Sequence, residues 1–405
     1  MKPGVRTRAA AARALMDVTE NGAWSNRVAE VLVEEMPQRE KAKTLRLFMD
    51  AVRFRRRLDR AIDSVITRPL DDADPEIRAC LRIGAVDLLL HRTPSFAAIS
   101  TAVEATRELD VGHASSFVNA ALRKLDERGE PALEGEARYE QWGVEDHVFG
   151  IVAELLGEDA AAAFFEACIE PPSVSCFVAS NSDTPLSFVP HDSIKGAGHL
   201  EHPSDADPPY IMDAASVAVG RVVGAKPGDT VLDIAAAPGG KTLVIADMMQ
   251  GEGLLVAADR HWNRLVRAAR RWDDLSLSVG IVQADGLASP FRPGSFDVVL
   301  LDAPCSGLGT LRRRPEIKDR VSTKNIASLA EIQGDLLAAA LPLVRPGGRL
   351  VYSVCTLTKQ ETIDRVEMYD AAPPEGLPGE ILGKGLLLAP HLTGTDGMFI
   401  SVITP

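Results

Sequence analysis

The stretch LDIAAAPGGKT, residues 232–242, joins the end of an apolar run to a glycine-rich turn and the start of a helical pattern. From Ala235 onward it also matches the loose phosphate-loop pattern, in which a small residue and four others precede Gly-Lys-Thr. The turn therefore fits two classes of protein: a nucleoside triphosphatase, and a protein that binds a different ligand at the end of a strand. The surrounding sequence has to decide between them.

The chain from residue 210 onward alternates apolar, strand-like runs with helical ones. The strand candidates are DTVLDIA, GLLVAADR, VGIVQADG, FDVVLLDAPCSG, GGRLVYSVCT and DGMFISVITP, and helical segments such as HWNRLVRAARRW lie between most of them. Strands that are apolar on both faces and separated by helices predict a doubly wound, mostly parallel α/β sheet of the Rossmann-like type. In such a sheet the ligand binds outside the carboxyl ends of the strands.

Four carboxylates stand at those carboxyl ends, namely Asp233, Asp259, Asp285 and Asp302. A single aspartate in such a place is most often a loop or helix-capping residue, but four at successive strand ends indicate a ligand site. Pro238 has no amide hydrogen to offer a phosphate, and the acids would repel a polyphosphate. They suit a cationic ligand with hydroxyl and amine groups, which favours S-adenosylmethionine over a nucleoside triphosphate.

Two of the five cysteines, Cys305 in DAPCSG and Cys355 in YSVCT, also follow strand candidates directly. An odd number of widely spaced cysteines argues against a disulfide framework and for a reducing, cytoplasmic setting. No His/Cys cluster in the sequence has the spacing of a metal site. A lone cysteine is usually a small buried hydrophobe, and we interpret Cys80, Cys168 and Cys176 in this way. Two thiols beside a methyl-donor site instead point to covalent chemistry.

Methylation of cytosine at carbon 5 requires such chemistry, because this carbon is a weak nucleophile. A thiolate that adds to carbon 6 turns the ring into an enamine, whose carbon 5 attacks the sulfonium methyl group. Loss of the carbon-5 proton then lets the thiol leave. The reaction needs a nucleophilic cysteine, a base near carbon 5, and an acid that contacts ring nitrogen 3 and the exocyclic amine. Asp302, three residues before Cys305, is a candidate for that acid.

The motifs DIAAAPGGKT, DAPCSG and YSVCT closely resemble the signatures of the NOL1/NOP2/Sun family of RNA 5-methylcytosine methyltransferases, and GTLRRRPEIK and the terminal DGMFI match the same pattern. The resemblance implies that Cys355 is the nucleophile and that Cys305 assists product release. The chain departs from the family pattern at Thr362, where an asparagine is frequent, and this weakens the case for loop support near Cys355. The resemblance also implies an S-adenosylmethionine site made of Ala235, Ala236, Ala237, Pro238, Gly239, Gly240, Lys241, Asp259, Arg260, Asp285 and Asp302.

Residues 1–130 have helical spacing throughout. Two segments, EIRACLRIGAVDLLLHR and SSFVNAALRKL, place apolar residues on one helix face: Ile77, Leu81, Gly84 and Leu88 in the first, and Val118, Leu122 and Leu125 in the second. Together these segments resemble the NusB-type RNA-binding domain, which precedes the methyltransferase in the Sun/Fmu branch that modifies small-subunit ribosomal RNA. We therefore expect an all-helical NusB-like RNA-binding domain at 1–130, a connecting segment with helices and room for one short strand at 131–208, and an S-adenosylmethionine-dependent methyltransferase domain at 209–405.

The net charge of −13 is unevenly spread. Residues 1–130 hold 22 Lys/Arg and 20 Asp/Glu, a balance of +2, and the remainder holds 22 Lys/Arg and 37 Asp/Glu, a balance of −15.

Two runs of arginine are candidates for RNA contact. Arginine runs are usually solvated faces, but these two lie where RNA phosphates would position a substrate. We predict that both runs contact RNA, and that the second borders the substrate cleft because it follows Cys305. Their members are Arg55, Arg56 and Arg57, and Arg312, Arg313 and Arg314.

We therefore predict a cytoplasmic, monomeric enzyme that methylates RNA, expected to be 16S ribosomal RNA, free or in an assembling small subunit. The target cytosine has to be unstacked to reach Cys355. No apolar run approaches the roughly 18 residues that span a bilayer, so we expect no membrane contact, and we expect no metal. Two alternatives stay open: the same reaction on transfer RNA or 23S ribosomal RNA, and a non-catalytic NusB-like RNA-binding or ribosome-assembly factor. The presence of both cysteines and Asp302 argues against the second.

Overall fold

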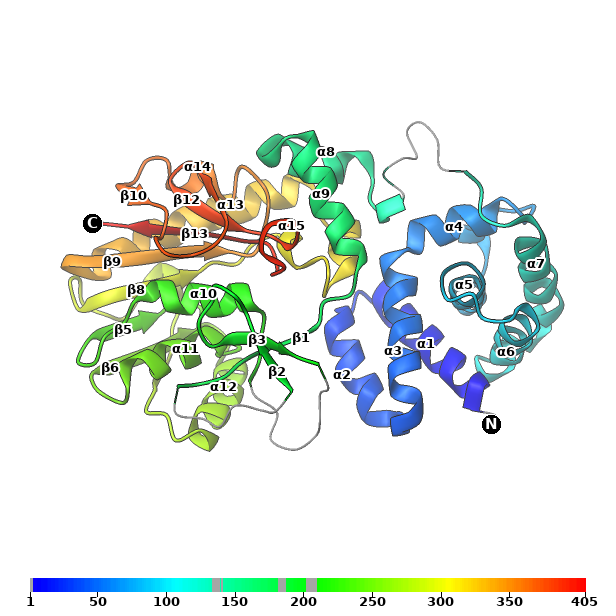
Figure 1. The fold of residues 1–405 in the computed structure, drawn as a ribbon, viewed down its shortest axis with the longest axis horizontal. Helices are drawn as coiled ribbons and strands as arrows, with labels where there is room; N and C mark the ends of the chain where they lie inside the picture. Colours follow the sequence, from blue (N-terminus) through cyan, green and yellow to red (C-terminus); the bar gives the residue numbers. More distant parts are fainter. Residues whose placement is uncertain (1–2, 133–138, 140, 181–186, 202–209) are drawn as a thin grey trace. The chain divides into compact units, whose positions relative to one another are not determined.

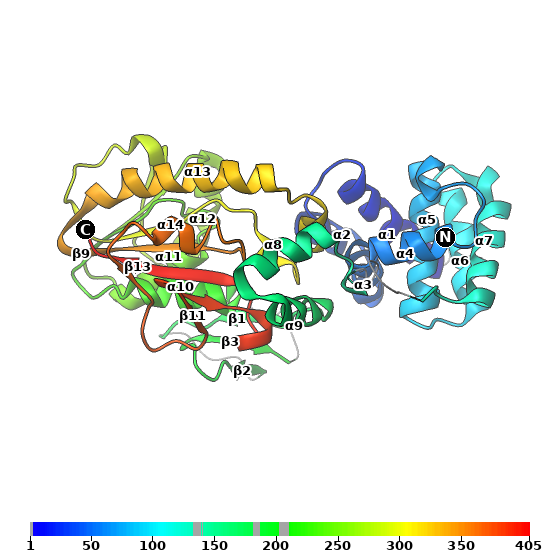
Figure 2. The same cartoon turned by 90° about the horizontal axis from the view of Figure 1, so that it is seen from above.

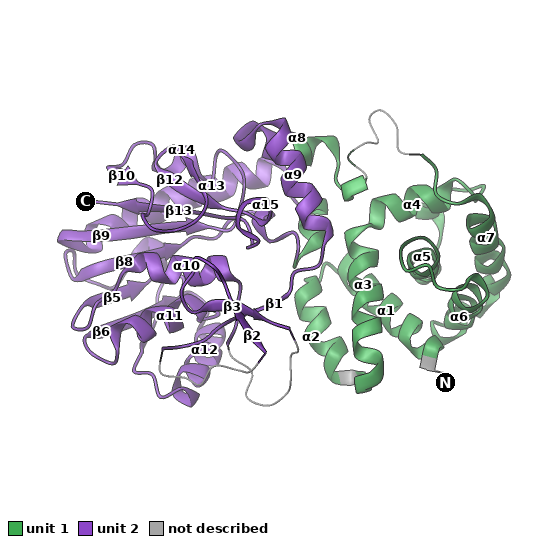
Figure 3. Ribbon diagram, in the orientation of Figure 1, with its two compact units in different colours: residues 1–149, 313–320 green, residues 150–312, 321–405 purple. Residues whose placement is uncertain are grey.

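The computed structural model describes residues 3–132, 139, 141–180, 187–201 and 210–405. The chain forms two compact units (Figure 3): unit 1 comprises residues 1–149 and 313–320, and unit 2 comprises residues 150–312 and 321–405. We predicted boundaries near residues 130 and 208, whereas the division between the units falls after Phe149. Residues 313–320 belong to unit 1 although the chain on both sides of them belongs to unit 2.

Unit 1 is built from helices, and its described residues contain no strand. Its helices are α1 (Pro3–Thr19), α2 (Ser25–Glu35), α3 (Gln38–Arg53), α4 (Arg55–Asp63), α5 (Pro75–Ala85), α6 (Ser95–Glu108) and α7 (Ser115–Arg128) (Figure 1). A further helix, α8 (Asp146–Leu156), begins in unit 1 and ends in unit 2. The prediction that the first third of the chain is all helical is confirmed.

The predicted apolar faces of α5 and α7 meet in the core of unit 1. Leu81 and Leu122 are both fully buried. Gly84 marks the closest approach, since a Cβ at this position would lie only 2.5 Å from Cδ1 of Leu122, and a side chain there would force the two helices apart. Leu88 lies in a π-helical turn, Val86–Leu90, and is only partly buried, so the predicted face ends one turn earlier than expected.

The segment 313–320 is held in unit 1 by buried polar side chains. Lys318 donates from Nζ to the carbonyl oxygens of Val52 at 3.3 Å and Arg53 at 2.6 Å, which are the last carbonyls of α3. A cation at this place satisfies carbonyls that have no partner within the helix. Burial lowers the pKa of Lys318 to about 8. Glu316 accepts a hydrogen bond from the backbone amide of Ser25 at 2.9 Å.

Unit 2 contains a nine-stranded sheet in the order β11-β12-β13-β9-β8-β5-β6-β7, and β10 also pairs with β13. Its parallel strands are β9 (Val344–Val354), β8 (Phe296–Asp302), β5 (Thr230–Asp233), β6 (Leu254–Asp259) and β7 (Gly280–Gln283). The antiparallel strands are β13 (Met398–Ile403), β12 (Gly385–Leu388), β11 (Glu380–Leu382) and β10 (Ala371–Ala372). The predicted doubly wound α/β fold is confirmed, with antiparallel strands added at one edge.

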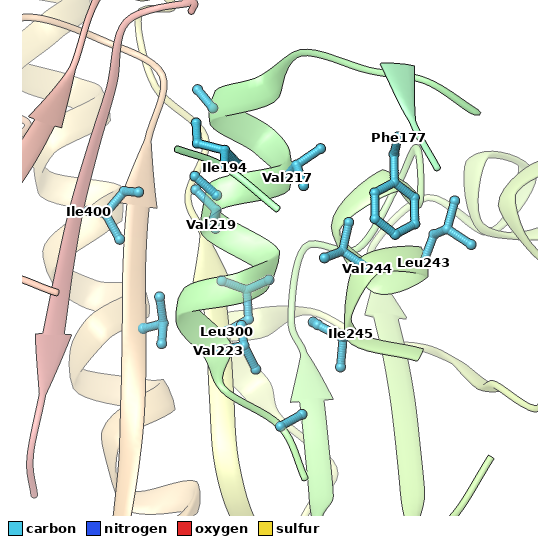
Figure 4. Close-up of a cluster of buried hydrophobic side chains, with 14 of the residues drawn as sticks. Phe177, Ile194, Val217, Val219, Val223, Leu243, Val244, Ile245, Leu300 and Ile400 are labelled. Atoms are coloured by element: carbon cyan, nitrogen blue, oxygen red, sulfur yellow. The ribbon is translucent and has the colours of Figure 1, made fainter. Parts of the chain in front are cut away.

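Helices cover both faces of this sheet because side chains alternate along its strands. Val231 and Leu300 belong to a cluster with the buried side chains of α10 (Ala214–Val223) and α11 (Gly240–Met249). Figure 4 shows Leu300 among side chains such as Val223 and Ile245. Their chain neighbours Leu232 and Leu301 pack on the other side, in a cluster that includes side chains of α13 (Thr323–Ala340) (Figure 2). A smaller cluster joins α12 (Trp262–Asp274) to β6.

Helix α13 corrects one expectation. With the turn that follows it, this helix spans residues 323–343 and is long and apolar enough, by composition, to cross a membrane. We had expected no run of that length. Leu336, Leu337 and Ala340 of this helix are packed in the core beneath the sheet, so the apolar composition is explained by sheet packing.

A small antiparallel sheet precedes the large one in the chain. Its strands are β1 (Val174–Phe177), β2 (Phe188–Pro190), β3 (Ala197–Leu200) and β4 (Tyr210–Ile211), in the order β2-β3-β1-β4. We predicted a connecting segment at 131–208 with room for one short strand, parts of which lie outside the described residues. Strands of two to four residues are too short to show the alternation that identifies a strand. The remaining helices of unit 2 are α9 (Glu158–Ile169), α14 (Ile363–Val366) and α15 (Pro390–Thr393).

Candidate active site

Three neighbouring parallel strands of unit 2 each end in an acidic residue. In the order β8-β5-β6, these residues are Asp302, Asp233 and Asp259. Parallel strands present their carboxyl ends at the same edge of a sheet, so the three carboxylates share that edge. Asp285 lies two residues beyond the end of β7 and accepts a hydrogen bond from the amide of Leu287 at 3.1 Å, capping a short helical turn.

Asp233 is the most deeply buried of these acids. Its Oδ2 accepts a hydrogen bond from the hydroxyl of Thr242 at 2.7 Å, whereas its buried Oδ1 has no hydrogen-bond partner among the described residues. Burial raises the pKa of Asp233 to about 7, because an apolar surrounding penalises the charged form. A buried acceptor without a partner is costly in a folded protein. It is therefore a place where a ligand donor would be stabilised.

The turn between β5 and α11 is shaped by the next strand rather than by phosphate binding. The amide of Ala236 donates to the carbonyl of Ala258 at 3.0 Å, and the amide of Ala237 donates to Oδ2 of Asp259 at 3.2 Å. Since Pro238 has no amide hydrogen, three consecutive residues offer nothing to a phosphate. This arrangement differs from the amide cradle of a phosphate loop, and it agrees with our preference for another ligand.

Gly239 ends that turn with a positive φ of 103°. A Cβ at this position would lie 2.8 Å from Cζ2 of Trp272 and 2.9 Å from Cβ of Ala268. The indole Nε1 of Trp272 donates to the carbonyl of Gly239 at 3.1 Å. The backbone is thus fixed from α12, and only glycine fits both the conformation and the space.

Lys241 was predicted as part of the cofactor turn, and its side chain reaches a second acid. Nζ of Lys241 donates to Oδ2 of Asp302 at 2.7 Å, and the hydroxyl of Ser353 donates to Oδ1 of the same carboxylate at 2.8 Å. Burial lowers the pKa of Lys241, but Asp302, Cys355 and Asp233 outweigh that effect and the pKa is raised. The ammonium group is therefore a fixed positive charge beside Asp302 and Cys355.

The two predicted cysteines meet at this edge of the sheet. The Sγ atoms of Cys305 and Cys355 are 3.3 Å apart although 50 residues of chain separate them. The pKa of Cys305 is raised well above its ordinary value by the hydrogen bond to Cys355, by burial, and by the negative charges of Cys355, Glu361 and Asp302. Cys305 is thus held as a thiol. Cys80, Cys168 and Cys176 are buried elsewhere, as we predicted for cysteines without a chemical role.

Sequence reasoning missed a buried hydrogen-bond network beneath the cysteines. It is centred on Glu361, which is fully buried. We had looked for loop support at Thr362, which is also fully buried and donates to the carbonyl of Thr358 at 2.6 Å. Glu361 directly precedes Thr362 in the motif SVCTLTKQET, and this position in the motif was the signal from which the sequence could have identified it. The other members of the network are Ser306, Gln333, Tyr352, Thr356 and Thr358.

The predicted arginines are divided between the units and are largely paired. Arg55 and Arg56 form ion pairs with Asp319, Arg56 also with Glu145, and Arg57 pairs with Glu130. In the second run, Arg312 belongs to unit 2 and donates to the carbonyl of Gly394 at 2.8 Å. Arg313 and Arg314 belong to unit 1, where the guanidinium of Arg314 lies 5.9 Å from the ring centre of Trp24. Arg260 is exposed at the end of β6.

The described residues contain no group of three or more His, Cys, Asp and Glu side chains arranged to hold a metal ion.

Comparison with known proteins gives two family matches. The model of the 16S rRNA methyltransferases RsmB/F matches residues 221–404, and the model of the NusB family matches residues 5–127. The probable ribosomal RNA small subunit methyltransferase B of Synechocystis is 30% identical to this chain over 396 residues, which cover 88% of this chain and 89% of the relative. The corresponding Bacillus subtilis protein is 28% identical over an alignment of 437 positions, which covers 96% of this chain and 96% of the relative.

A solved structure shows the same fold. The crystal structure of PH0851 superimposes with a TM-score of 0.83 at 22% identity and covers 100% of this chain and 99% of its own. The two relatives above match 88% and 96% of this chain, and the strand-end acids and paired cysteines lie within the methyltransferase match. The chain therefore belongs to the RsmB/F family of S-adenosylmethionine-dependent ribosomal RNA cytosine methyltransferases.

Proposed function

We propose that this protein transfers a methyl group from S-adenosylmethionine to carbon 5 of a cytosine in 16S ribosomal RNA, through a covalent adduct with Cys355. The observation that carries the proposal is the pair of thiols, 3.3 Å apart, beside the Lys241–Asp302 pair. A reaction in which a thiol acts only as the nucleophile would need only one cysteine. Two adjacent thiols in different electrostatic surroundings suit a reaction in which an adduct has to be formed and then broken.

The residues at the strand ends fit S-adenosylmethionine, which supplies an electrophilic methyl group when bound. The unpaired, buried Oδ1 of Asp233 is an acceptor for a ligand amine or hydroxyl. Asp259 follows the next strand, where an acid commonly binds a ribose diol. The turn from Ala235 to Gly240 would line the cofactor with its backbone, and Arg260, Asp285 and Asp302 would complete the site. These assignments follow the family pattern and the shared edge of the sheet.

Cys355 is the proposed nucleophile because a positive charge faces it. The ammonium group of Lys241 interacts electrostatically with Cys355, and a nearby cation stabilises a thiolate. The thiolate adds to carbon 6 of cytosine, and a bond forms between Sγ and that carbon. The electrons of the carbon 5–carbon 6 double bond then become available at carbon 5 for attack on the methyl group. Asp302, fixed by Lys241 and Ser353, is placed to contact ring nitrogen 3 and the exocyclic amine.

Cys305 is the proposed aid to release because it is held as a thiol. After methyl transfer, carbon 5 loses its proton to a base, the carbon 5–carbon 6 double bond re-forms, and the bond from carbon 6 to Sγ of Cys355 breaks. Sγ of Cys305 lies 3.3 Å from that sulfur and can deliver its proton as the sulfur leaves. Cys355 then carries the proton, and Cys305 regains one from solvent.

The RNA is proposed to be 16S ribosomal RNA, free or in an assembling small subunit, since the RsmB/F family match and the names of the relatives point to the small subunit. The target cytosine has to leave its stack to reach the thiols. Arg312, Arg313 and Arg314 remain proposed phosphate contacts. Arg55, Arg56 and Arg57 are also proposed phosphate contacts. Their ion pairs with Asp319 and Glu130 would compete with the phosphates for the guanidinium groups. We also propose a monomer in the cytoplasm; the odd number and wide spacing of the cysteines favour a reducing setting.

The experiment is a trapping assay. Cys305→Ala protein, expressed in cells and separated on a denaturing gel, should carry RNA covalently bound to Cys355. The adduct should disappear after ribonuclease treatment and in the Cys305→Ala, Cys355→Ala double variant. Sequencing the trapped RNA then identifies the substrate, including a transfer RNA or 23S RNA. Methyl transfer by unmutated protein without any trapping would overturn the cysteine roles, and no transfer to any RNA would favour a binding role.

A further inference from the structure

The carboxylate of Glu361 joins the two loops that carry the thiols. Its Oε1 accepts from the amide of Ser306 at 2.8 Å and from Nε2 of Gln333 at 3.0 Å. Its Oε2 accepts from the hydroxyls of Ser306, Thr358 and Thr356, the last two at 2.9 Å and 3.4 Å. Ser306 directly follows Cys305, and Thr356 directly follows Cys355. One side chain therefore contacts the residue that follows each cysteine, through the backbone amide and hydroxyl of Ser306 and through the hydroxyl of Thr356.

Further bonds make this arrangement rigid. The hydroxyls of Ser306 and Thr356 are 2.7 Å apart, so the two cysteine loops also contact each other directly. Gln333, on α13, donates to the carbonyl of Pro304 at 2.9 Å. The hydroxyl of Tyr352 donates to the carbonyl of Glu361 at 2.8 Å. A side chain whose partners are themselves fixed keeps its position to within the tolerance that catalysis requires.

A carboxylate is unusual in so buried a place as that of Glu361. The side chain is completely inaccessible, and no basic side chain among the described residues lies within ion-pair distance of it. A buried carboxylate stabilised only by neutral donors costs free energy that a neutral residue would not. A neutral glutamine would accept the two N–H donors through its oxygen and donate to the hydroxyls. Hydrogen bonding alone therefore does not explain why a glutamate, and not a glutamine, stands at this position.

We infer that Glu361 is a positioning residue, which sets the spacing of Cys305 and Cys355 and whose carboxylate disfavours a thiolate at Cys305, so that the two thiols act in different steps. The groups that face Cys305 support this division. Its neighbours Cys355, Glu361 and Asp302 are all acidic, and they raise the pKa of Cys305 together with its hydrogen bond to Cys355 and its burial. The cation of the site, Lys241, is bonded to Asp302 and faces Cys355. Tyr352 lies close by as a neutral phenol, since burial raises its pKa. The inference rests on the proposed roles of the two cysteines.

The test separates charge from geometry with two variants. Glu361→Gln removes the charge and keeps most hydrogen bonds, whereas Glu361→Asp keeps the charge and withdraws it by one methylene group. The first readout needs no RNA: the rate of alkylation of each cysteine by iodoacetamide is followed against pH, peptide by peptide, by mass spectrometry. For Cys305 we expect the midpoint to fall in Glu361→Gln toward the ordinary thiol value of about 8.5 and to stay high in Glu361→Asp.

The second readout is methyl transfer under saturating cofactor. We expect kcat to fall at least tenfold in Glu361→Asp, with KM for RNA unchanged, because the thiols lose their spacing. In Glu361→Gln the first turnover should persist, and release should slow at a pH above about 8.5, where Cys305 loses its proton, so that covalent adduct accumulates there. Glu316→Gln is the matched control, since Glu316 is also a buried glutamate that accepts a backbone N–H, but in unit 1. It should change neither readout.

Unchanged alkylation profiles and unchanged kcat in both folded variants would overturn the inference. If either variant fails to fold, Thr358→Val removes one donor to Oε2 and keeps the carboxylate, so its kcat should fall by a smaller factor. An unchanged kcat would again contradict the inference. Failure of the proposed function gives a different result: unmutated protein would transfer no methyl group, while the alkylation profiles of the two cysteines would still respond to Glu361→Gln.

Discussion

Nζ of Lys241 lies 2.7 Å from Oδ2 of Asp302, and this contact joins the cofactor turn to the loop that carries Cys305. The pair links the first residues of α11 to the end of β8. Because Ser353 holds the other oxygen of Asp302 at 2.8 Å, the carboxylate has one orientation toward the space where the base has to lie.

Replacing Asp302 by asparagine should lower kcat strongly. The variant loses the charge-assisted bond to Lys241 and the acceptor for the cytosine amine, and removal of one such electrostatic contact costs roughly 100-fold or more. Single-turnover methyl transfer to the RNA identified by trapping measures the effect. Asp297→Asn is the control, because Asp297 is a buried aspartate near the start of the same strand, where it accepts from the amide of Thr230 at 2.8 Å. Equal losses in both variants would assign the effect to folding.

The stability of unit 2 should depend on pH through Asp233. Its folded pKa of about 7 lies above the ordinary value, so the folded state holds the proton more tightly than the unfolded chain. The stabilisation that this proton gives to the folded state is complete below the unfolded pKa of about 3.9, and it is lost as the pH rises through 7. Relative to Asp233→Asn, the free energy of unfolding should therefore fall between pH 4 and pH 8, by about 4 kcal/mol at most at 1.4 kcal/mol per pKa unit. Denaturant titrations at several pH values measure it, and parallel pH curves would contradict it.

Gly239→Ala should impair both stability and cofactor binding. The positive φ of 103° and the contact at 2.8 Å with Trp272 are both unfavourable for a side chain, and each such strain costs about 1–3 kcal/mol. Gly228→Ala is a matched control with a φ of 92° and open space around its Cβ. The difference between the two variants isolates the clash. Calorimetric titration with S-adenosylmethionine should show weaker binding only for Gly239→Ala, and identical affinities would contradict our placement of the cofactor.

Mild oxidation should join Cys305 to Cys355 and inactivate the enzyme reversibly. Hydrogen peroxide oxidises one thiol to a sulfenic acid, the other sulfur displaces water, and two molecules of water are released for each disulfide formed. The sulfurs are already 3.3 Å apart. Cys80 and Cys176 should not react, because burial raises their pKa values to about 12 and about 11.

Peptide mapping should show the loss of two hydrogen atoms in the linked pair, and dithiothreitol should restore methyl transfer. Persistent inactivation after reduction, or inactivation without a linked Cys305–Cys355 peptide, would contradict this route.

Much of the fold and the core of the site follow from local sequence. The acids at the ends of β5, β6 and β8 are visible because each ends an apolar run, and parallel pairing then brings them to one edge. Cys305 and Cys355 are visible for the same reason. The motifs carry this information within a few residues, so no knowledge of packing is required.

The network around Glu361 and the ion pairs of the arginines depend on distant parts of the chain. Glu361 bonds to Gln333 and Ser306, which are 28 and 55 residues away. Asp319 pairs with Arg55 across 264 residues. A charge pattern shows which side chains are basic, but it does not show which acids the fold brings to them. The short strands β2 and β4 escaped prediction because they are too brief to show a period.

The assignment of residues 313–320 to unit 1 limits how the protein can be divided. The chain passes between the units after residues 149, 312 and 320. A fragment that ends at Phe149 lacks the buried Lys318 that caps α3 and the acid that pairs with Arg55. Removal of the first 149 residues, in turn, leaves those eight residues without the helices that bury them. The two units are therefore not exchangeable modules: a gene fission, a domain swap or a proteolytic cut between them has to carry this short segment along or replace it.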